Sequence, residues 1–423
     1  MTTNTAGVKL TTAYAAYISK TQPADTYSGQ VIYILVHPAA AEPDTSTSNC
    51  EPGHICYDAN VDSSEIEGAM DTQALIKAKD WSSCNSFTDY ATTCIINGLP
   101  IDINTLPELD SYADLTLQAS NFKREGYGFA GWNDKADISG TNYGPNQTIP
   151  VTQDIIDNGI TFYAHWVEST GNLQGWNGCS TLNTNQVVGL TDTRDNNVYA
   201  VSKLADGNCW MIENLRLADK DNNNNPITLN STNTNNPAPN FTALSATSND
   251  WCGGINETCI NQNNLNTDNI ISFTANTTGS QGSDIYSYGN YYNWYTATAG
   301  TGTFSQASGN ASGDICPNGW SLPTGENDGQ FSVLDISMGG TSSSQITAEA
   351  SNRWRSYPNN FLYSGVFSAS SASSRGFNGG YWSSSATGDT VASFGMQLNI
   401  SSVYVTSANY KVFGNSIRCV ANS

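Results

Sequence analysis

Positive charge is scarce in this sequence. Its 423 residues include only 16 Lys and Arg against 37 Asp and Glu, so the net charge is −21. A surface that binds nucleic acid needs a cationic stripe that releases counterions from phosphates, and no segment of the sequence forms one. An acidic membrane surface would also repel the chain. We therefore expect no nucleic acid among its partners and no direct membrane insertion.

Metal-binding signatures are also scarce. The only histidines are His37, His54 and His165, and none of the ten cysteines forms a CxxC pair. Structural zinc sites use such pairs or histidine partners, so the even number of cysteines is better explained by disulfides formed in an oxidising compartment. The cysteines are Cys50 and Cys56, Cys84 and Cys94, Cys252 and Cys259, which are near neighbours, and Cys179, Cys209, Cys316 and Cys419.

No signal peptide and no membrane span is visible in the sequence. Its first ten residues, MTTNTAGVKL, are polar. We expect Met1 to follow an export signal that has been removed, and whether a domain was removed with it stays open. Together with the cysteines, this predicts an extracellular or cell-surface protein.

Uncharged polar and aromatic residues are what the chain has in abundance. Apolar residues make up 38% of it and charged residues only 13%, and it holds 21 Tyr and 10 Trp. This composition is typical of extracellular β-rich proteins, because aromatic residues favour strands while Ser, Thr and Asn keep the surface solvated. The length suggests about two to four domains. We expect a multidomain fold that is mostly β with some α.

Residues 1–44 predict a β-hairpin. Aromatic and β-branched residues fill 7–18 and 26–37, and a turn at 22–25 separates them. The run at 31–36 (VIYILV) is apolar on both faces, so it needs cover on both sides, which two strands do not supply. We expect the hairpin to be the remnant of a β-sandwich or adhesin-like module.

Residues 45–168 carry an ordered strand pattern. The stretch 121–133 reads NFKREGYGFAGWN, and TI at 148–149 and TFYAHW at 161–166 follow it. This pattern resembles the Listeria–Bacteroides repeat, a small β-grasp-like module of bacterial surface proteins that serves as a spacer and stalk element. Under this resemblance 55–73 contains the first strand and 74–113, with its two cysteines, is an insertion. The aromatic residues are interpreted as core, and His165 as structural.

A linker at 169–178 precedes a second set of motifs in 179–423. They are RDNNVY at 194–199, WMIENL at 210–215, YGNYYNW at 288–294, CPNGWSLPT at 316–324, YWSS at 381–384 and RCV at 418–420. The set resembles the Fibrobacter succinogenes major paralogous domain, whose C-terminal part is similar to C-type-lectin-like and formylglycine-generating-enzyme-like folds. The resemblance implies a C-type-lectin-like α+β domain.

The cysteines and tryptophans make physical sense under this fold. It implies that Cys316 and Cys419 join the CPNGW strand to the last strand. The simplest remaining pairs are then Cys179 with Cys209 and Cys252 with Cys259, although the sequence leaves the connectivity open. The motif tryptophans are interpreted as core residues whose indole N–H groups need partners, with sugar stacking as the alternative. They are Trp210, Trp294, Trp320 and Trp382.

Polar and apolar residues alternate over 391–399. One set predicts a buried strand face (Ala392, Phe394, Met396, Leu398), and the other a face open to solvent (Ser393, Gly395, Gln397, Asn399). We therefore expect a recognition surface between residues 351 and 404. Its candidate ligand-binding residues are Trp354, Tyr357, Ser368, Ser370, Ser373, Phe377, Asn378, Ser385, Thr387, Asp389, Ser393 and Gln397.

Signatures of catalysis are missing. No GxSxG motif stands with a plausible histidine, and all three histidines precede residue 179. Paired carboxylates for glycoside hydrolysis have no motif that nominates them. We expect no enzymatic activity.

Calcium is the one cofactor that stays open. Asp219 and Asp221 resemble the start of a calcium loop, but the Gly at its sixth position and the Glu at its twelfth are missing. Glu326 and Asp328 form a second candidate after the LPT motif. Neither region shows the EPN or WND motif of calcium-dependent sugar binding. Solvated loops without a cofactor are the expected state.

These features favour recognition over catalysis. We predict a binding protein that displays its lectin-like domain to a protein or glycan ligand on another cell surface. Domains of the resembled family also serve as variable proteins of diversity-generating retroelements, and 367–404, rich in Ser, Asn, Thr, Gly and Tyr, lies where such variation falls. Two alternatives stay open: a glycan-binding adhesin with fixed specificity, and a structural surface-layer or stalk component.

Overall fold

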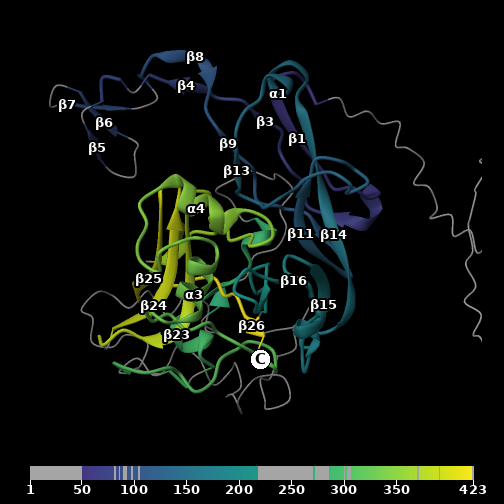
Figure 1. The fold of residues 1–423 in the computed structure, drawn as a ribbon, viewed down its shortest axis with the longest axis vertical. Helices are drawn as coiled ribbons and strands as arrows, with labels where there is room; N and C mark the ends of the chain where they lie inside the picture. The colour runs from purple at the N-terminus through teal and green to yellow at the C-terminus, as the bar shows by residue number, and fades with distance from the viewer. Residues whose placement is uncertain are drawn as a thin grey trace, which may run out of the picture. The chain divides into compact units, whose positions relative to one another are not determined.

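The computed structural model describes residues 50–80, 82–84, 86–88, 93–96, 99–102, 105–217, 270–271, 285–299, 301–302, 306–368, 371–389 and 391–421. Side chains at 86–88, 93, 270–271, 368 and 371–373 lie outside this description. The described chain is mostly β, as predicted, with four short α-helices (Figure 1). Several predictions fall outside the described residues: the hairpin at 1–44, the Cys252–Cys259 pair, and the candidates Asp219, Asp221 and Ser370.

The first half of the described chain is built around two long strands. β11 (Tyr127–Asn133) pairs antiparallel with β14 (Ile160–Asn172), and β1 (His54–Asp58) pairs with β14 in parallel. The short strands β12 (Asn142–Tyr143) and β3 (Gln73–Ala74) extend this sheet. Helix α1 (Gln153–Asn158) begins after Thr152, whose hydroxyl accepts a hydrogen bond from the backbone N–H of Ile155, a typical N-cap.

Of the aromatic residues predicted to form the core, Phe129 and Trp132 are buried, whereas Tyr127, Tyr163 and Trp166 are half-buried. The Trp132 ring lies 5.0 Å from the ring of Phe129 at a steep angle. Edge-to-face contacts of this kind add to the apolar burial. The Trp132 indole N–H donates to the carbonyl of Gln118 at 3.0 Å, so burial leaves no polar atom of the ring unsatisfied.

Short ladders accompany the main sheet. Strands β4 (Lys77–Lys79) and β8 (Glu108–Tyr112) form one, and β5 (Ser86–Thr88), β6 (Thr93–Ile96) and β7 (Leu99–Asp102) form a separate three-stranded sheet. Both lie within the stretch 74–113 that was expected to be an insertion. Two further ladders join β2 (Ile66–Glu67) to β10 (Lys123–Arg124), and β9 (Leu115–Thr116) to β13 (Thr148–Ile149).

One sheet continues from the first half of the chain into the second. β14 runs on to Asn172 and pairs with β15 (Val187–Thr191), so 169–172, expected as linker, is strand instead. The order then passes through β16 (Val198–Lys203), β17 (Cys209–Met211), β26 (Val420–Ala421) and β20 (Trp320–Ser321). Backbone hydrogen bonds across the expected boundary are the physical reason, because a paired strand is no longer free to act as a hinge.

Side chains also join the two halves. The Asn352 amide donates to the carbonyl of Thr148 at 2.9 Å and accepts from its N–H at 2.7 Å, as a neighbouring strand would. The guanidinium of Arg355 donates to Asn146 O and to Thr148 Oγ1. These contacts help to make residues 48–423 one compact unit.

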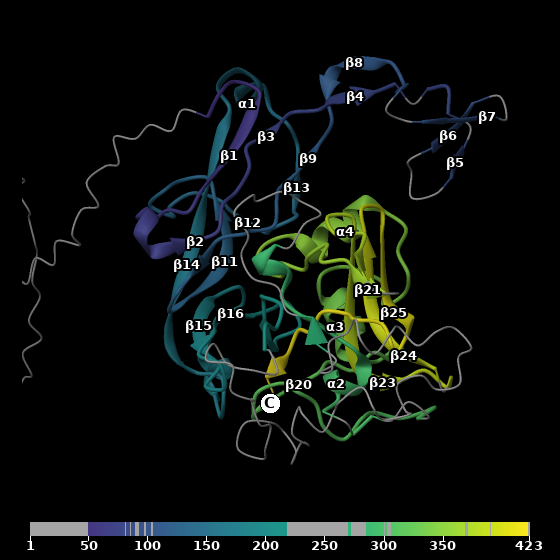
Figure 2. The same cartoon turned by 180° about the vertical axis from the view of Figure 1, so that it is seen from behind.

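A three-stranded antiparallel sheet lies in the C-terminal half, formed by β23 (Asn378–Ala386), β24 (Ala392–Asn399) and β25 (Ser402–Tyr410). Helices α3 (Gln330–Ser337) and α4 (Ala348–Arg355) pack against β25 (Figure 2). The short elements near this sheet are α2 (Trp294–Ala297), β18 (Ile270–Ile271), β19 (Tyr291–Tyr292), β21 (Val366–Ser368) and β22 (Ser371–Ser373).

The motif tryptophans lie in the core, as predicted. Trp210, Trp294, Trp320 and Trp382 are fully buried. Their indole N–H groups donate, in that order, to the carboxylate of Asp206 and to the carbonyls of Ser383, Leu173 and Tyr292. Because each ring is buried and hydrogen-bonded, the alternative of sugar stacking by these four tryptophans is wrong.

Four disulfides are formed among the residues that the structure describes. Cys316–Cys419 and Cys179–Cys209 pair as the resemblance implies, and the near neighbours Cys50–Cys56 and Cys84–Cys94 also pair. No cysteine within the described ranges is free. Disulfides of this number are typical of secreted and extracellular proteins, which fold in an oxidising environment. None of the helices in the described part of the chain is long and apolar enough to cross a membrane.

Candidate functional site

One face of the β23–β24–β25 sheet is rich in amide and hydroxyl side chains. Across the strands Asn378 lies opposite Asn399, Gln397 opposite Tyr404, and Gly395 opposite Ser407. Opposite residues of a ladder share a face, and the register shift between Gly395 and Gln397 places Ser407 and Asn409 on the same face as Tyr404. We call it the polar face, and it consists of Asn378, Gln397, Asn399, Tyr404, Ser407 and Asn409.

Hydrogen bonds hold the centre of the polar face in place. The Gln397 amide donates to Asn409 Oδ1 and accepts from the hydroxyl of Ser407 at 3.0 Å. Asn409 is buried, whereas Gln397 and Ser407 remain half-buried and so keep part of their surface in contact with solvent. The amide groups are therefore oriented before any ligand arrives. Amide N–H groups that this network does not use can donate to a ligand, and unused lone pairs of the amide oxygens can accept from one.

The end of the polar face at Asn378 and Asn399 is also held by hydrogen bonds. The side-chain oxygen of Asn399 accepts hydrogen bonds from the N–H of Ser401 at 2.9 Å and from the hydroxyl of Ser402 at 2.8 Å. Asn378, at the start of β23, is half-buried beside it, and the preceding Phe377 is 66% exposed. Neutral hydrogen-bonding groups and an exposed aromatic ring thus lie at the same end of the sheet.

The alternation predicted over 391–399 is correct, but the predicted exposure is wrong. Met396 and Leu398 are fully buried on one face, as expected. Ser393, expected in solvent on the opposite face, is also fully buried, and its hydroxyl donates to the carbonyl of Ser385 at 2.7 Å. The reason is a second core, because Trp382 shares the face of Ser393 and packs there against Trp294.

Two other predicted ligand residues are structural. Trp354 is fully buried, and its indole N–H donates to Asp335 at 3.0 Å. Ser385 is fully buried, and its hydroxyl donates to Asn310 at 2.7 Å. Neither side chain is accessible to a ligand at the surface, so the expectation that they contact one is corrected. Their burial could not be inferred from residue type alone.

The remaining candidates are spread over the domain. Tyr357 is half-buried, and its ring lies 6.4 Å from the ring of His165, which belongs to β14. Thr387 and Asp389 lie in the turn between β23 and β24, at the opposite end of the sheet from Asn378. The side chains of Ser368 and Ser373 lie outside the described set. The structure therefore brings together only Phe377, Asn378 and Gln397 from the predicted set.

Two residues of the polar face lie beyond the segment predicted for recognition. Ser407 and Asn409 come from β25, past residue 404. Strict alternation over 402–410 (SVYVTSANY) places both on the buried face of Val403 and Val405, because all four positions have the same parity. A register shift in the pairing of β24 with β25 moves them to the face of Gln397, and the sequence of β25 carries no local signal for that shift.

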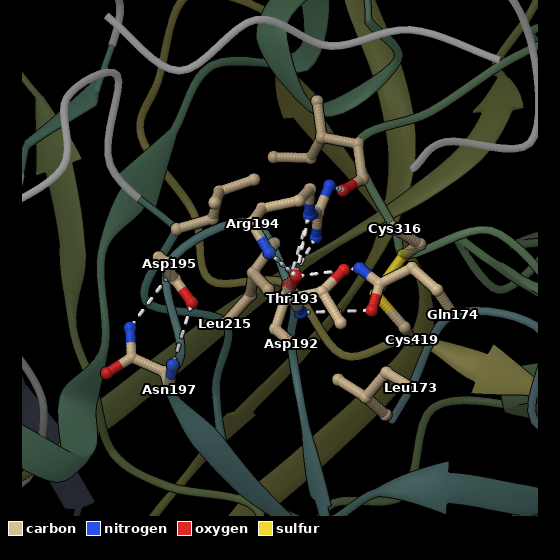
Figure 3. Close-up of polar contacts among 12 residues, drawn as sticks. Leu173, Gln174, Asp192, Thr193, Arg194, Asp195, Asn197, Leu215, Cys316 and Cys419 are labelled. Carbon is tan, nitrogen blue, oxygen red and sulfur yellow. Dashed lines mark hydrogen bonds and ion pairs between the residues drawn. A yellow bond between two sulfur atoms is a disulfide. The ribbon is translucent and has the colours of Figure 1, made fainter. Parts of the chain in front are cut away.

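Arg194 of the RDNNVY motif forms a buried ion pair with Asp192 (Figure 3). Arg194 Nη2 lies 2.6 Å from Asp192 Oδ2, and both side chains are fully buried. Gln174 donates to Asp192 Oδ1 at 2.7 Å, and Arg194 Nη1 donates to the carbonyl of Ile315 at 2.6 Å. Burial opposes ionisation of Asp192, but the guanidinium outweighs it and holds the pKa of this carboxyl below its ordinary value. The pair joins the loop after β15 to the segment of Cys316.

Two other carboxyl groups near this pair bind protons more tightly than usual. Burial raises the pKa of Asp314 to about 6, even though the N–H groups of Cys316 and Leu322 donate to it. Burial, followed by the negative charge of Asp192, raises the pKa of Asp195 to about 6. Raised carboxyl pKa values often mark active sites, but these groups already have their backbone partners.

We expect Asp314 to make stability depend on pH. The folded chain keeps a proton on this carboxyl up to about pH 6, whereas an unfolded chain releases it near the ordinary value of 3.8. The folded state therefore binds more protons in this window, and stability falls as pH rises through it. Urea unfolding at several pH values should show a shallower fall between pH 3.8 and about 6 in Asp314→Asn than in the wild type. Equal slopes would contradict this assignment.

The predicted calcium ligands do not gather into a site. Glu326 and Asp328 are both exposed in the segment before α3. Among the described residues, no group of three or more His, Cys, Asp or Glu is placed to hold a metal ion. Asp219 and Asp221 lie outside the described ranges.

Comparison with known proteins identifies no relative of this chain. No protein-family model, no curated protein and no solved structure matches the chain. Function must therefore be inferred from the geometry of the polar face and from the chemistry of its residues.

Proposed function

We propose that this chain is a secreted or cell-surface protein that binds a ligand through the polar face of its C-terminal sheet. The observation that carries the proposal is the amide network in which Gln397 is held by Ser407 and Asn409 on a half-exposed strand pair. Side chains fixed before binding lose less conformational entropy when a ligand arrives. The resemblance of 179–423 to a C-type-lectin-like domain, a fold used for recognition, agrees with this role.

The chemistry of the polar face favours a neutral, hydroxyl-rich ligand. Its six residues carry amide and hydroxyl groups and no acid or base, although the whole chain has a net charge of −21. Each amide donates and accepts at once, as pairs of sugar hydroxyls do. The exposed ring of Phe377 beside Asn378 adds apolar surface at the same end. A glycan on another cell surface is therefore the ligand class we propose first, and an uncharged polar protein surface is the second.

Diversification by a retroelement is compatible with the same face. Asn378, Gln397, Asn399 and Tyr404 all fall within 367–404, and Tyr is among the products that adenine-rich asparagine codons readily give. An imperfect, adenine-biased copy of this segment beside a reverse transcriptase gene would support a variable binding protein. Without such a copy, the proposal is that of an adhesin with fixed specificity.

Replacing Gln397 is the direct test of the polar face. Gln397→Ala removes the partner of both Ser407 and Asn409 and leaves the backbone of β24 intact. A hydrogen bond between the Gln397 amide and the ligand contributes about 0.5–1.5 kcal/mol, and the variant also loses the bonds that orient Ser407 and Asn409. We therefore expect the affinity for a glycan identified on an array to fall about tenfold. Calorimetry or surface plasmon resonance would measure the change.

A matched control lies outside the polar face. Gln186→Ala removes an exposed amide just before β15 and should leave affinity unchanged. A Gln397→Ala variant that folds and binds as tightly as the wild type would count against the polar face as the binding site. Binding lost on addition of EDTA would instead point to a calcium-dependent site elsewhere in the chain.

A further inference from the structure

Strand β25 forms an open edge of the three-stranded sheet. On one side it pairs with β24 along its length. On the other side Gln345 and Val403 exchange backbone hydrogen bonds of 2.9 Å, and from Tyr404 to Asn409 no further ladder forms with any described residue. The opposite edge of the sheet, at β23, is covered by bridges from other segments. Figure 2 shows β25 as the last strand on its side of the sheet.

The sequence of this edge does little to prevent pairing. Exposed edge strands are usually protected by lysines, other charges or proline, because their free N–H and C=O groups are a template for another strand. Residues 400–410 (ISSVYVTSANY) contain no charged residue and no proline. Their valines, tyrosines and threonine favour strands. Only the register shift opposite Met396 interrupts the ladder.

Exposed aliphatic side chains flank the open edge. Ile346, 75% exposed, directly follows Gln345, and Ile400, 43% exposed, lies in the turn that leads into β25. Ile336, 54% exposed, belongs to α3, which packs against the same strand. Apolar groups gathered beside unpaired backbone suit an incoming strand that is itself apolar on both faces.

We propose that the open edge of β25 accepts residues 26–37 of a second copy of this chain as an additional strand. The segment (TYSGQVIYILVH) contains no acidic residue, lysine or arginine, and its run VIYILV is apolar on both faces. A strand of that type needs cover on both sides, which a sheet edge with aliphatic flanks supplies. Two copies with a net charge of −21 repel each other, so contact is least opposed between an uncharged segment and an uncharged edge.

The connection within one chain favours pairing between copies. Only the twelve residues 38–49 separate the segment from Cys50, which its disulfide ties to β1. Figures 1 and 2 show β1 and β25 on opposite sides of the described chain. A neighbouring copy can bring its own β25 within reach of the segment, whereas the β25 of the same chain is fixed on the far side. Because donor segment and acceptor edge are different surfaces, each copy can give and receive a strand, which builds chains of subunits rather than closed pairs.

Light scattering and sedimentation of the full chain over a wide range of concentration test the proposal. We expect association that grows with concentration, together with slower hydrogen exchange at residues 402–410 in the associated form. Ala408→Lys places a charge on the edge at an exposed position, and Ile34→Lys interrupts the apolar segment. Each variant should weaken association at least tenfold.

Ala205→Lys is the matched control, because it makes the same substitution at an exposed residue in the turn between β16 and β17, in a different sheet. It should associate like the wild type. A wild-type chain that stays monomeric at every concentration would overturn the proposal, and so would Ala408→Lys or Ile34→Lys variants that associate as well as the control. Ligand binding through Gln397 is a separate readout, since Ala408 lies on the other face of the sheet.

Discussion

Removal of the Cys316–Cys419 disulfide is expected to lower the free energy of unfolding by about 4–5 kcal/mol. The two cysteines are 103 residues apart in sequence and fully buried in the core that contains Trp294 and Trp320. A cross-link over so long a loop restricts the unfolded chain strongly, and this loss of entropy is what stabilises the folded state in the chain-entropy model. Guanidinium unfolding of Cys316→Ala with Cys419→Ala would measure the change.

The Cys50–Cys56 disulfide provides the comparison. Its cysteines are six residues apart, so the same model predicts that its removal costs about 2 kcal/mol. A smaller loss for the long loop than for the short one would show that the Cys316–Cys419 bond does not act through the unfolded chain. Both double variants should be compared under conditions in which the other disulfides remain intact.

Replacement of Arg194 by methionine is expected to lower the free energy of unfolding by about 3–5 kcal/mol, because Asp192 is left as a buried charge without its partner. The guanidinium makes three hydrogen bonds to this carboxylate and one to the carbonyl of Ile315. Gln174 alone then remains to stabilise the carboxylate through its side chain. Denaturant unfolding at neutral pH would measure the loss.

Two controls separate buried charge from lost packing. Adding Asp192→Asn to Arg194→Met removes the unpaired charge and should restore part of the stability. Arg124→Met breaks an ion pair with Glu65 whose side chains are partly exposed, and it should cost less than about 1 kcal/mol. If the double variant is no more stable than Arg194→Met, the loss comes from packing and not from the carboxylate.

The motifs of the C-terminal half proved to be structural signatures. The Asp192–Arg194 pair, with Asp195 next to it, is buried, and the arginine of the closing RCV motif, Arg418, donates to Asn214 Oδ1 at 2.6 Å from within the core. Residue type and order could predict that tryptophans and cysteines meet in a core, because apolar burial and covalent pairing follow from side-chain chemistry. They could not show that the charged motif residues form their hydrogen bonds and ion pairs inside the core, since these contacts depend on distances in space.

The continuous sheet is the clearest departure from the expected domain plan. The stretch 169–178 (STGNLQGWNG) was expected to be a linker, yet its first four residues complete β14. Strand pairing is a long-range interaction, so the local composition of a segment does not predict whether a partner such as β15 lies beside it. Hydrogen bonds between β14 and β15 therefore cross the predicted boundary between the modules, although no local sequence pattern indicates them.

By itself, the sequence determined the mostly β character, the oxidising environment implied by paired cysteines, the buried tryptophans and the alternation of β24. These follow from composition and from the two-residue period of a strand, which are local properties. Only the tertiary structure decided which face of that strand meets solvent. Ser393 and Gln397 have the same parity in the sequence, but the second core around Trp382 covers one and leaves the other partly exposed. Exposure depends on what packs across a face, and that is settled by segments distant in the chain.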